Sequence, residues 1–403
     1  MTFEYIGYKL KKTMQQSSST KTGSLFSTRL LALYIISFSA GASLGIFNPL
    51  ISTFMEQRQI DEVWIGANST VYFLTIALST PLVEKLLRQT GIHRIMMFGL
   101  LLTSFSAPLF PMTAQLPFWF VIRIVMGFGV CCFLVSGQTA LNNFSHESNR
   151  ASVSGIYFLA LGMGFVIGPV IGSRIYAISP QLAFIVGGGV LLCGLAFAWR
   201  DLPRKLIVST PSPTSSSKIL NKLTLPIFGV FSYGFAEATL ITLYPVFLLR
   251  QNYSVQQMGY TFSVFVVGSI LSTVPVTQLA DRSGKVRILF ISVCIGLLAS
   301  LGLIWVETYE IVLFVSFLAG ASIGPIYPLC LSLIGEQLSE EELPSGTALF
   351  TTTYSFGCAA GPILSSIMME TFGGRHLFSL CIPLYAMLLL RIGLQHRNLR
   401  RFQ

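Results

Sequence analysis

Two ionisable side chains, Arg123 and Glu237, lie deep inside long apolar stretches of this sequence. A charged side chain at the centre of a bilayer costs roughly 2.5–3.5 kcal/mol on insertion scales, so such residues persist where they pair, face water or work. Removing a carboxyl group from water favours its protonated form, so Glu237 could take up and release a proton near neutral pH. Arg123 could bind an anionic substrate group or tune a neighbouring carboxylate.

Each of the two residues has a structural alternative. Arg123 lies too far from either end of its apolar stretch to reach the surface. It should therefore face the interior of a helix bundle, where it could instead satisfy backbone carbonyls of a neighbouring helix. Glu237 could form an ion pair with an arginine, or lie nearer the outer surface than its position indicates. Because the two residues fall in different halves of the chain, the sequence leaves open whether they approach each other.

The elements that must position these residues are membrane-spanning helices. Apolar residues make up 53% of the chain and charged residues 10%, with a mean hydropathy of +0.70, whereas soluble domains carry about 25% charged residues. With a window of about 20 residues, the sequence predicts an all-α integral membrane protein with twelve transmembrane helices. The spans lie near residues 30–55, 64–87, 94–113, 117–141, 152–177, 181–199, 223–249, 257–280, 287–306, 310–335, 345–371 and 376–395.

Polar segments divide the chain into two six-helix bundles. We expect a cytoplasmic disordered tail at 1–28, a first bundle at 29–200, a cytoplasmic linker at 201–222, a second bundle at 223–396 and a cytoplasmic tail at 397–403. The linker is rich in Ser and Pro, which is typical of a flexible tether. With both termini inside, 21 of the 26 Lys and Arg residues fall on the inner side. The positive-inside rule therefore predicts a multi-pass protein of the plasma (inner) membrane with both termini cytoplasmic.

The two halves repeat each other at an offset of 193 to 197 positions. The matches are Asn48-Pro49 with Tyr244-Pro245, Gly127 with Gly324, Gly168-Pro169 with Gly361-Pro362, and Glu84-Lys85 with Asp281-Arg282. Each match falls on the equivalent span of its half. Parallel repeats of this kind build transporters whose substrate site lies between the halves near the midplane. Asn48, Tyr244 and Tyr327 could line such a site together with Glu237 and Arg123.

A short segment between the eighth and ninth spans carries the string Leu-Ala-Asp-Arg-Ser-Gly-Lys. Asp281 could cap the start of the next helix and pair with basic groups, Gly284 permits a tight turn, and Arg282 holds the loop at the cytoplasmic face. The segment resembles the loop signature of the major facilitator superfamily, with Thr277 in place of its first glycine, and Glu84 belongs to a degraded first-half copy. The resemblance covers essentially the whole chain. It implies that Asp281 and Arg282 act as a conformational latch between helix ends.

Two further strings resemble signatures of the same superfamily. Arg123 begins a string that looks like the Arg-x-x-x-Gly-x-Gly motif, which the family uses in proton coupling. In the fifth span, Gly164, Gly168, Pro169 and Gly172 form a GxxxGPxxG string. Glycines every four residues give a flat face for close helix contact, and the proline bends the helix. This string resembles the antiporter signature of drug and metabolite exporters, with a partial copy at Gly361-Pro362.

Other chemistries find no support in the sequence. The seven cysteines and four histidines do not have the spacing of metal ligands. We find no Walker-type phosphate loop and no nucleophile constellation, and the basic residues lie on loops that orient the protein in a membrane. We therefore expect a monomer that is not an enzyme, has no cofactor or metal, and binds no nucleic acid. Its expected partners are a small-molecule substrate, protons and the lipid bilayer.

The sequence is interpreted as a proton-coupled secondary transporter that exports a small organic molecule by alternating access. In this interpretation Glu237 is the proton-responsive carboxylate, Arg123 modulates it or binds an anionic group, and the glycines of the fifth span set the helix contact that opens and closes. The alternative is an uptake carrier, a symporter or uniporter, for a small anion or sugar, in which Arg123 is the substrate ligand. A non-transporting scaffold or receptor would lose no flux when either charged residue is replaced.

Overall fold

The computed structural model describes residues 25–145, 149–203, 223–306, 308–339 and 342–401, and within these ranges the chain forms helices and no strand. Eleven segments of this part of the chain are long and apolar enough to cross a membrane. A further helix, α14 (Leu343–Phe372), has 30 residues and is rich in Ser and Thr, which lowers its hydropathy without shortening it. The expected all-α membrane fold of two helical bundles is confirmed.

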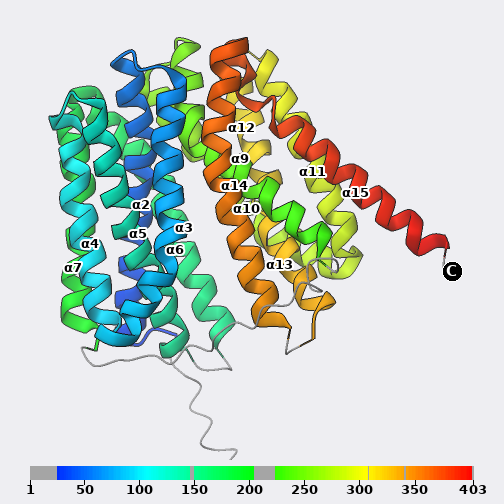
Figure 1. Ribbon diagram of the computed structural model, residues 1–403, viewed down its shortest axis with the longest axis horizontal. Helices are drawn as coiled ribbons and strands as arrows, with labels where there is room; N and C mark the ends of the chain where they lie inside the picture. Colours follow the sequence, from blue (N-terminus) through cyan, green and yellow to red (C-terminus); the bar gives the residue numbers. More distant parts are fainter. Residues whose placement is uncertain (1–24, 146–148, 204–222, 307, 340–341, 402–403) are drawn as a thin grey trace, which may run out of the picture.

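The two halves of the chain form two groups of helices that stand side by side (Figure 1). The first group comprises α2 (Thr28–Gln57), α3 (Glu62–Thr90), α4 (Ile92–Ser106) with the 3-10 helix η1 (Ala107–Met112), α5 (Leu116–Phe144), α6 (Arg150–Ile178) and α7 (Pro180–Asp201). The second comprises α9 (Thr224–Arg250), α10 (Val255–Ser283), α11 (Lys285–Trp305), α12 (Tyr309–Ile323), α13 (Ile326–Gln337), α14, η2 (Gly374–Phe378) and α15 (Cys381–Arg401). Helices α12 and α13 are two parts of one crossing.

The helices extend a few residues beyond the apolar spans, because polar residues at their ends satisfy free backbone groups. Ser27 accepts a hydrogen bond from the amide of Leu30 at 3.3 Å, and Ser254 and Gln257 form a capping box at the start of α10. Helix α15 continues through Arg401, so residues 397–401 of the expected tail are helical, since no proline or glycine ends the helix after Gly393. Residues 1–24 of the expected tail and 204–222 of the expected linker lie outside the described residues.

The connection between α10 and α11 is shorter than the expected loop. Helix α10 ends at Ser283 and α11 begins at Lys285, so the connection is Gly284, whose φ of +94° suits a glycine. Asp281 lies in the last turn of α10, and no side chain caps the start of α11. The prediction that Asp281 caps the next helix is therefore wrong, because the turn leaves no residues between the carboxylate and the preceding helix.

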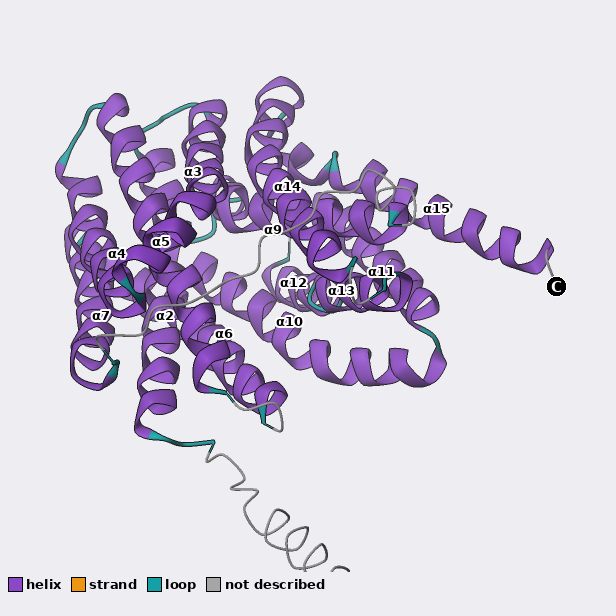
Figure 2. Ribbon diagram, turned by 60° about the horizontal axis from the view of Figure 1, so that its bottom comes forward, coloured by secondary structure: helices purple, strands orange, loops and turns teal. Residues whose placement is uncertain are grey.

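The most extensive contacts between the two halves are made by two helix pairs, α3 with α14 and α6 with α10 (Figure 2). Thr70 of α3 donates to the carbonyl of Ala359 at 2.8 Å. Ser263 of α10 donates to the carbonyl of Val166 at 2.7 Å. Thr70 and Ser263, like Val166 and Ala359, are 193 positions apart. The duplicated sequence thus makes the same interface contact twice.

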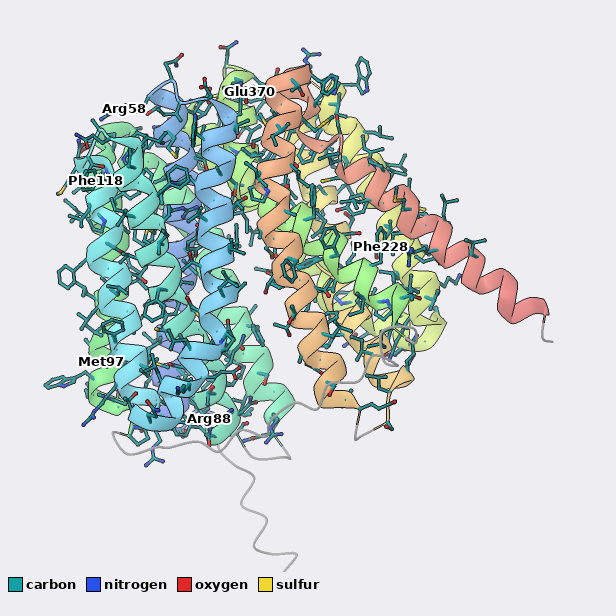
Figure 3. All side chains as sticks on the ribbon, in the orientation of Figure 1. Arg58, Arg88, Met97, Phe118, Phe228 and Glu370 are labelled. Carbon is teal, nitrogen blue, oxygen red and sulfur yellow. The ribbon has the colours of Figure 1, made fainter. Side chains whose placement is uncertain are left out.

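The two ends of the molecule differ. We call the end at which α7 ends and α9 begins the linker end, and the opposite end the distal end; Figure 3 shows Arg88 at the linker end and Arg58 and Glu370 at the distal end. The interface contacts described above lie in the distal halves of their helices. Towards the linker end, a groove of about 680 Å³ separates α3 from α14.

An ion-pair cluster closes the distal end. Arg250, the last residue of α9, binds Glu56 near the end of α2 through two bonds, Nε to Oε1 at 2.8 Å and Nη2 to Oε2 at 3.0 Å. The same guanidinium contacts Glu62, the first residue of α3. We call these three residues the distal ion pair. It joins the second half to the first, so the molecule is closed at the distal end and open at the linker end.

Candidate functional site

Glu237 lies in the middle of α9, and both of its carboxylate oxygens accept a hydrogen bond from a tyrosine. The hydroxyl of Tyr233 donates to Oε1 at 2.9 Å, and that of Tyr354 to Oε2 at 2.7 Å. Tyr233 precedes Glu237 by four residues on the same helix, a spacing that places both on one face. Tyr354 reaches Glu237 because α14 packs against α9. Both bonds use the carboxyl group as an acceptor, as an ionised carboxylate does.

Three tyrosine rings gather beside this carboxylate. The ring centroids of Tyr233 and Tyr327 are 5.5 Å apart, those of Tyr233 and Tyr354 5.9 Å, and those of Tyr327 and Tyr354 5.6 Å. Tyr327 lies at the start of α13, just after the break that divides its crossing. We call Glu237 and the three tyrosines the Glu237 cluster. All four side chains are partly exposed.

The chemistry of the Glu237 cluster suits an organic cation. The face of an aromatic ring attracts a cation within about 6 Å of its centroid, and the carboxylate supplies the neutralising charge. The same carboxylate can bind a proton instead. A cation and a proton would therefore compete for one group, which is the chemical requirement for exchanging one against the other.

Arg123 is enclosed by the first half and is 1% exposed. Its Nη2 donates to the hydroxyl of Ser69 at 2.9 Å, and its Nη1 to Oδ1 of Asn48 at 3.3 Å. Its guanidinium carbon lies 4.3 Å from the centre of the Tyr72 ring. We call Arg123, Asn48, Ser69 and Tyr72 the Arg123 cluster; its members come from α5, α2 and α3.

The Arg123 cluster contains no carboxylate. Within the described part of the chain, Arg123 forms no ion pair, and its Nε has no hydrogen-bond partner. The aromatic face of Tyr72 and two neutral oxygens hold the charge instead. The polar contacts of Arg123 come from the first half and those of Glu237 from the second, so no described contact joins the two residues.

Tyr244 lies apart from both clusters. It is 1% exposed, and its hydroxyl is 2.6 Å from that of Ser316 in α12. Asn48 and Tyr244 occupy equivalent positions in the sequence repeat. Each forms a hydrogen bond with the fourth membrane crossing of its own half: Asn48 with Arg123 of α5, and Tyr244 with Ser316 of α12. The repeat therefore keeps the position of the contact and changes its chemistry. Of the residues expected at the site, the structure brings Glu237 together with Tyr327 and Arg123 together with Asn48.

The glycine string of α6 packs against α2 within the first half. A Cβ atom at Gly164 would overlap the carbonyl of Phe38, and one at Gly168 would overlap the carbonyl of Ala42. Gly172 lies next to Ile46, also in α2, and Gly361 packs in the same way on Phe235 of α9. The side of α6 that meets the other half carries the carbonyl of Pro169 and the side chain of Ser173, both next to Gly259. Pro362 and Ser366 face Gly66 in the same manner.

The residues of the expected latch lie at the linker end. Asp281 and Arg282 are exposed, and the ion pair next to them joins Lys285 of α11 to Glu336 of α13 at 2.6 Å. Both of these residues belong to the second half. Glu84 of α3 is exposed and lines the groove between α3 and α14.

Sequence reasoning did not select four members of the two clusters as site residues, namely Tyr233, Tyr354, Ser69 and Tyr72. Tyr354 gives no signal of its own, because only the packing of α14 on α9 brings it to Glu237. Ser69 and Tyr72 are three residues apart and therefore lie on one face of α3. This spacing was the available signal that both could contact Arg123, which belongs to the same bundle. The described residues contain no group of His, Cys, Asp and Glu side chains that could hold a metal ion.

Comparisons with known proteins agree with this architecture. The sequence matches the family model described as Major Facilitator Superfamily over residues 33–224 and 226–399. It is 28% identical over 358 residues to YfkF of Bacillus subtilis, named an uncharacterized MFS-type transporter, covering 86% of this chain and 90% of that protein. It is 23% identical over 360 residues to YcaD of Escherichia fergusonii, also named an uncharacterized MFS-type transporter, covering 87% and 92%.

The solved structures that are similar show the same fold at low identity. The nucleoside transporter NupG matches with a TM-score of 0.73 and 16% identity, covering 91% of this chain and 98% of that chain. A bacterial homolog of the human lysosomal transporter Spinster, in an inward-facing and unoccupied conformation, matches with a TM-score of 0.70 and 13% identity, covering 90% and 93%.

Proposed function

Because the chain belongs to the Major Facilitator Superfamily, we propose that it is a proton-coupled antiporter that exports a small organic cation across the plasma membrane. The observation that carries this proposal is the Glu237 cluster, in which the carboxylate of a partly exposed residue lies beside three tyrosine rings. The family is one of transporters, and we propose no enzymatic activity. The excess of Lys and Arg supports placing the linker end in the cytoplasm.

The proposed cycle uses one carboxylate for both ions. With the linker end open, a cytoplasmic cation displaces the proton from Glu237 and lies against the rings of Tyr233, Tyr327 and Tyr354. The halves then rock, the linker end closes, and the distal ion pair separates. From the distal side a proton binds Glu237, the cation leaves, and the protonated carboxyl group returns. One cation moves out for each proton that moves in.

In this cycle Arg123 has a positioning role. It ties α2, α3 and α5 together in a buried site, so the first half moves as one body against the second. The alternative, uptake of an anion that binds Arg123, requires an accessible guanidinium, whereas this one is 1% exposed. We therefore favour cation export over anion uptake.

The test measures proton release by purified protein when candidate cargo is added. We would compare tetraphenylphosphonium, benzoate and glucose in wild type, in Glu237→Gln and in Glu370→Gln, a matched change at an exposed carboxylate of the second half. Proton release is expected with the cation alone, in wild type and Glu370→Gln but not in Glu237→Gln. Cation binding with no proton signal in any of the three proteins would rule out antiport.

A further inference from the structure

The groove between α3 and α14 is the feature that the proposed cycle leaves unexplained. Its volume is about 680 Å³, and its lining comes from the linker halves of these two helices. Leu78 of α3 and Phe356 of α14 belong to the lining and are 70% and 60% exposed. On helices that cross a membrane, such exposed apolar side chains are suited to contact lipid chains, which would let the groove open sideways into the bilayer as well as towards the linker end.

Four hydroxyl groups of α14 line this groove: those of Thr347, Thr351, Thr352 and Ser355. We call them the hydroxyl row. Each donates its proton to the carbonyl four residues earlier in its own helix, at 2.9 to 3.0 Å. A hydroxyl has one proton to donate and two lone pairs that accept. The hydroxyl row therefore offers acceptors to a molecule in the groove, and its donors are already used.

The charged residue in the lining of the groove also favours a positively charged ligand. Glu84 lies at the linker end of the groove, and the lining contains no lysine, arginine or histidine. A carboxylate together with a row of acceptors favours a ligand that carries positive charge and N–H donors. The apolar remainder of the lining, including Leu74, Leu78 and Phe356, favours a ligand with a hydrocarbon body. An amphiphilic amine has both properties.

The groove and the Glu237 cluster share one helix, α14. Ser355, the innermost member of the hydroxyl row, directly follows Tyr354, whose hydroxyl binds Glu237 at 2.7 Å. A ligand that moves along α14 from Thr347 to Ser355 covers about 12 Å, at 1.5 Å per residue. At Ser355 it has reached the level of Tyr354 along the helix axis.

We propose that the α3–α14 groove is a lateral entrance through which an amphiphilic amine passes from the membrane leaflet at the linker end to the Glu237 cluster. Such an amine partitions into the bilayer with its ammonium group at the headgroup level, where Glu84 meets it. The hydroxyl row then accepts hydrogen bonds from the ammonium group while the hydrocarbon chain stays in contact with lipid. This inference rests on the proposed function and specifies its substrate class and route.

The test separates the rate of entry from the strength of binding. Protein in lipid nanodiscs is mixed rapidly with dodecylamine, and binding is followed in time and at equilibrium. Ala348→Trp fills the groove from an exposed position of its wall, and Ala196→Trp makes the same change at an exposed position of α7 as the control. In Ala348→Trp the association and dissociation rates are expected to fall by about tenfold while the dissociation constant changes by less than about twofold. Ala196→Trp should behave as wild type.

Several outcomes would overturn the lateral entrance. Unchanged rates in well-folded Ala348→Trp would mean that the amine enters elsewhere. A weakened dissociation constant with unchanged association would make the groove a binding site rather than an entrance. No binding of dodecylamine to wild type would remove the substrate class. If wild type binds the amine at the normal rate without proton release, the antiport proposal fails while the entrance stands.

A second variant tests the hydroxyl row without adding bulk. Thr351→Val combined with Ser355→Ala removes two acceptors and keeps the shape of the wall nearly unchanged. We expect slower association of dodecylamine and no change for dodecyltrimethylammonium, which has no N–H group. Equal slowing of both ligands, or of neither, would contradict a role of these hydroxyls as acceptors for the cargo.

Discussion

The two charged clusters differ in access and in partners. The Arg123 cluster is sealed inside the first half and holds its cation with an aromatic face and neutral oxygens. The Glu237 cluster is partly exposed in the second half and holds its carboxylate with two hydroxyl donors. A sealed charge can fix a structure, whereas an accessible one can exchange its partner. Under the proposed function, the first half therefore has the positioning role and the second half carries out the exchange.

The repeat shows why neither half carries both groups. By the sequence offset, Gly41 is the equivalent of Glu237, and Gly320 is the equivalent of Arg123. A Cβ atom at Gly41 would overlap the carbonyl of Leu161, and one at Gly320 would overlap the carbonyl of Phe265. Close helix contact at each equivalent position excludes any side chain. The two halves share one arrangement of helices. The first half has its ionisable residue in its fourth crossing, α5, and the second half in its first crossing, α9.

Replacing Glu237 by Gln should have the largest effect on transport. Glutamine keeps the shape of the side chain and cannot release a proton, so cation-driven proton flux in proteoliposomes should fall by about 100-fold or more. Thermal stability should change little, because the amide can still accept from one tyrosine. A stability loss with intact flux would reverse the roles that the comparison assigns.

Replacing Arg123 by Lys should produce the opposite pattern. An ammonium group cannot reproduce the geometry of a guanidinium that bonds Asn48 and Ser69 while it covers Tyr72. Because a buried hydrogen bond is lost, we expect a destabilisation of about 1–3 kcal/mol, measured by thermal denaturation in detergent. The ratio of protons to cations should stay unchanged. A changed ratio would show that Arg123 takes part in coupling directly.

Tyr354→Phe should weaken the proton exchange, and Tyr327→Phe should serve as its control. Tyr354 donates a 2.7 Å hydrogen bond to Glu237, and a bond to a charged group contributes about 1.5–3 kcal/mol. Cation affinity should therefore fall by about tenfold or more. Tyr327 contributes its ring alone to the Glu237 cluster, so loss of its hydroxyl should leave affinity nearly unchanged. Equal effects of the two changes would contradict the geometry.

Arg250→Ala tests the interface rather than either cluster, and its effect should be the smallest. The distal ion pair is partly exposed, so its contribution is about 1 kcal/mol, which is roughly a fivefold shift towards the distal-open state. Spin labels on the distal ends of α3 and α14 would report the distance between them. Arg58→Ala, at a distal arginine that directly follows α2 and contacts Phe54 of that helix, should leave the distances unchanged.

The sequence predicted the frame of the molecule better than its site. Hydropathy located the twelve segments because each helix must cover the same bilayer thickness, and the repeated Gly-Pro pairs identified equivalent crossings. The partners of Glu237 and Arg123 could not be predicted, because Tyr354 and Ser69 reach them across helix contacts rather than along the chain. The capping role expected of Asp281 was wrong because the turn after α10 is a single glycine.

Glu237 and Arg250 lie on the same helix, α9, so a tilt of this helix around one residue displaces the other. The two residues are 13 positions apart, which is about 20 Å along the axis at 1.5 Å per residue. If α9 tilts by about 10° around Glu237, its distal end moves by about 3–4 Å, which exceeds the margin within which an ion pair survives. A change of ligand at the carboxylate would then release the distal end without any chain of intermediate contacts. Through its length, this one helix would convert a small rearrangement of tyrosines into the opening of the opposite face of the membrane.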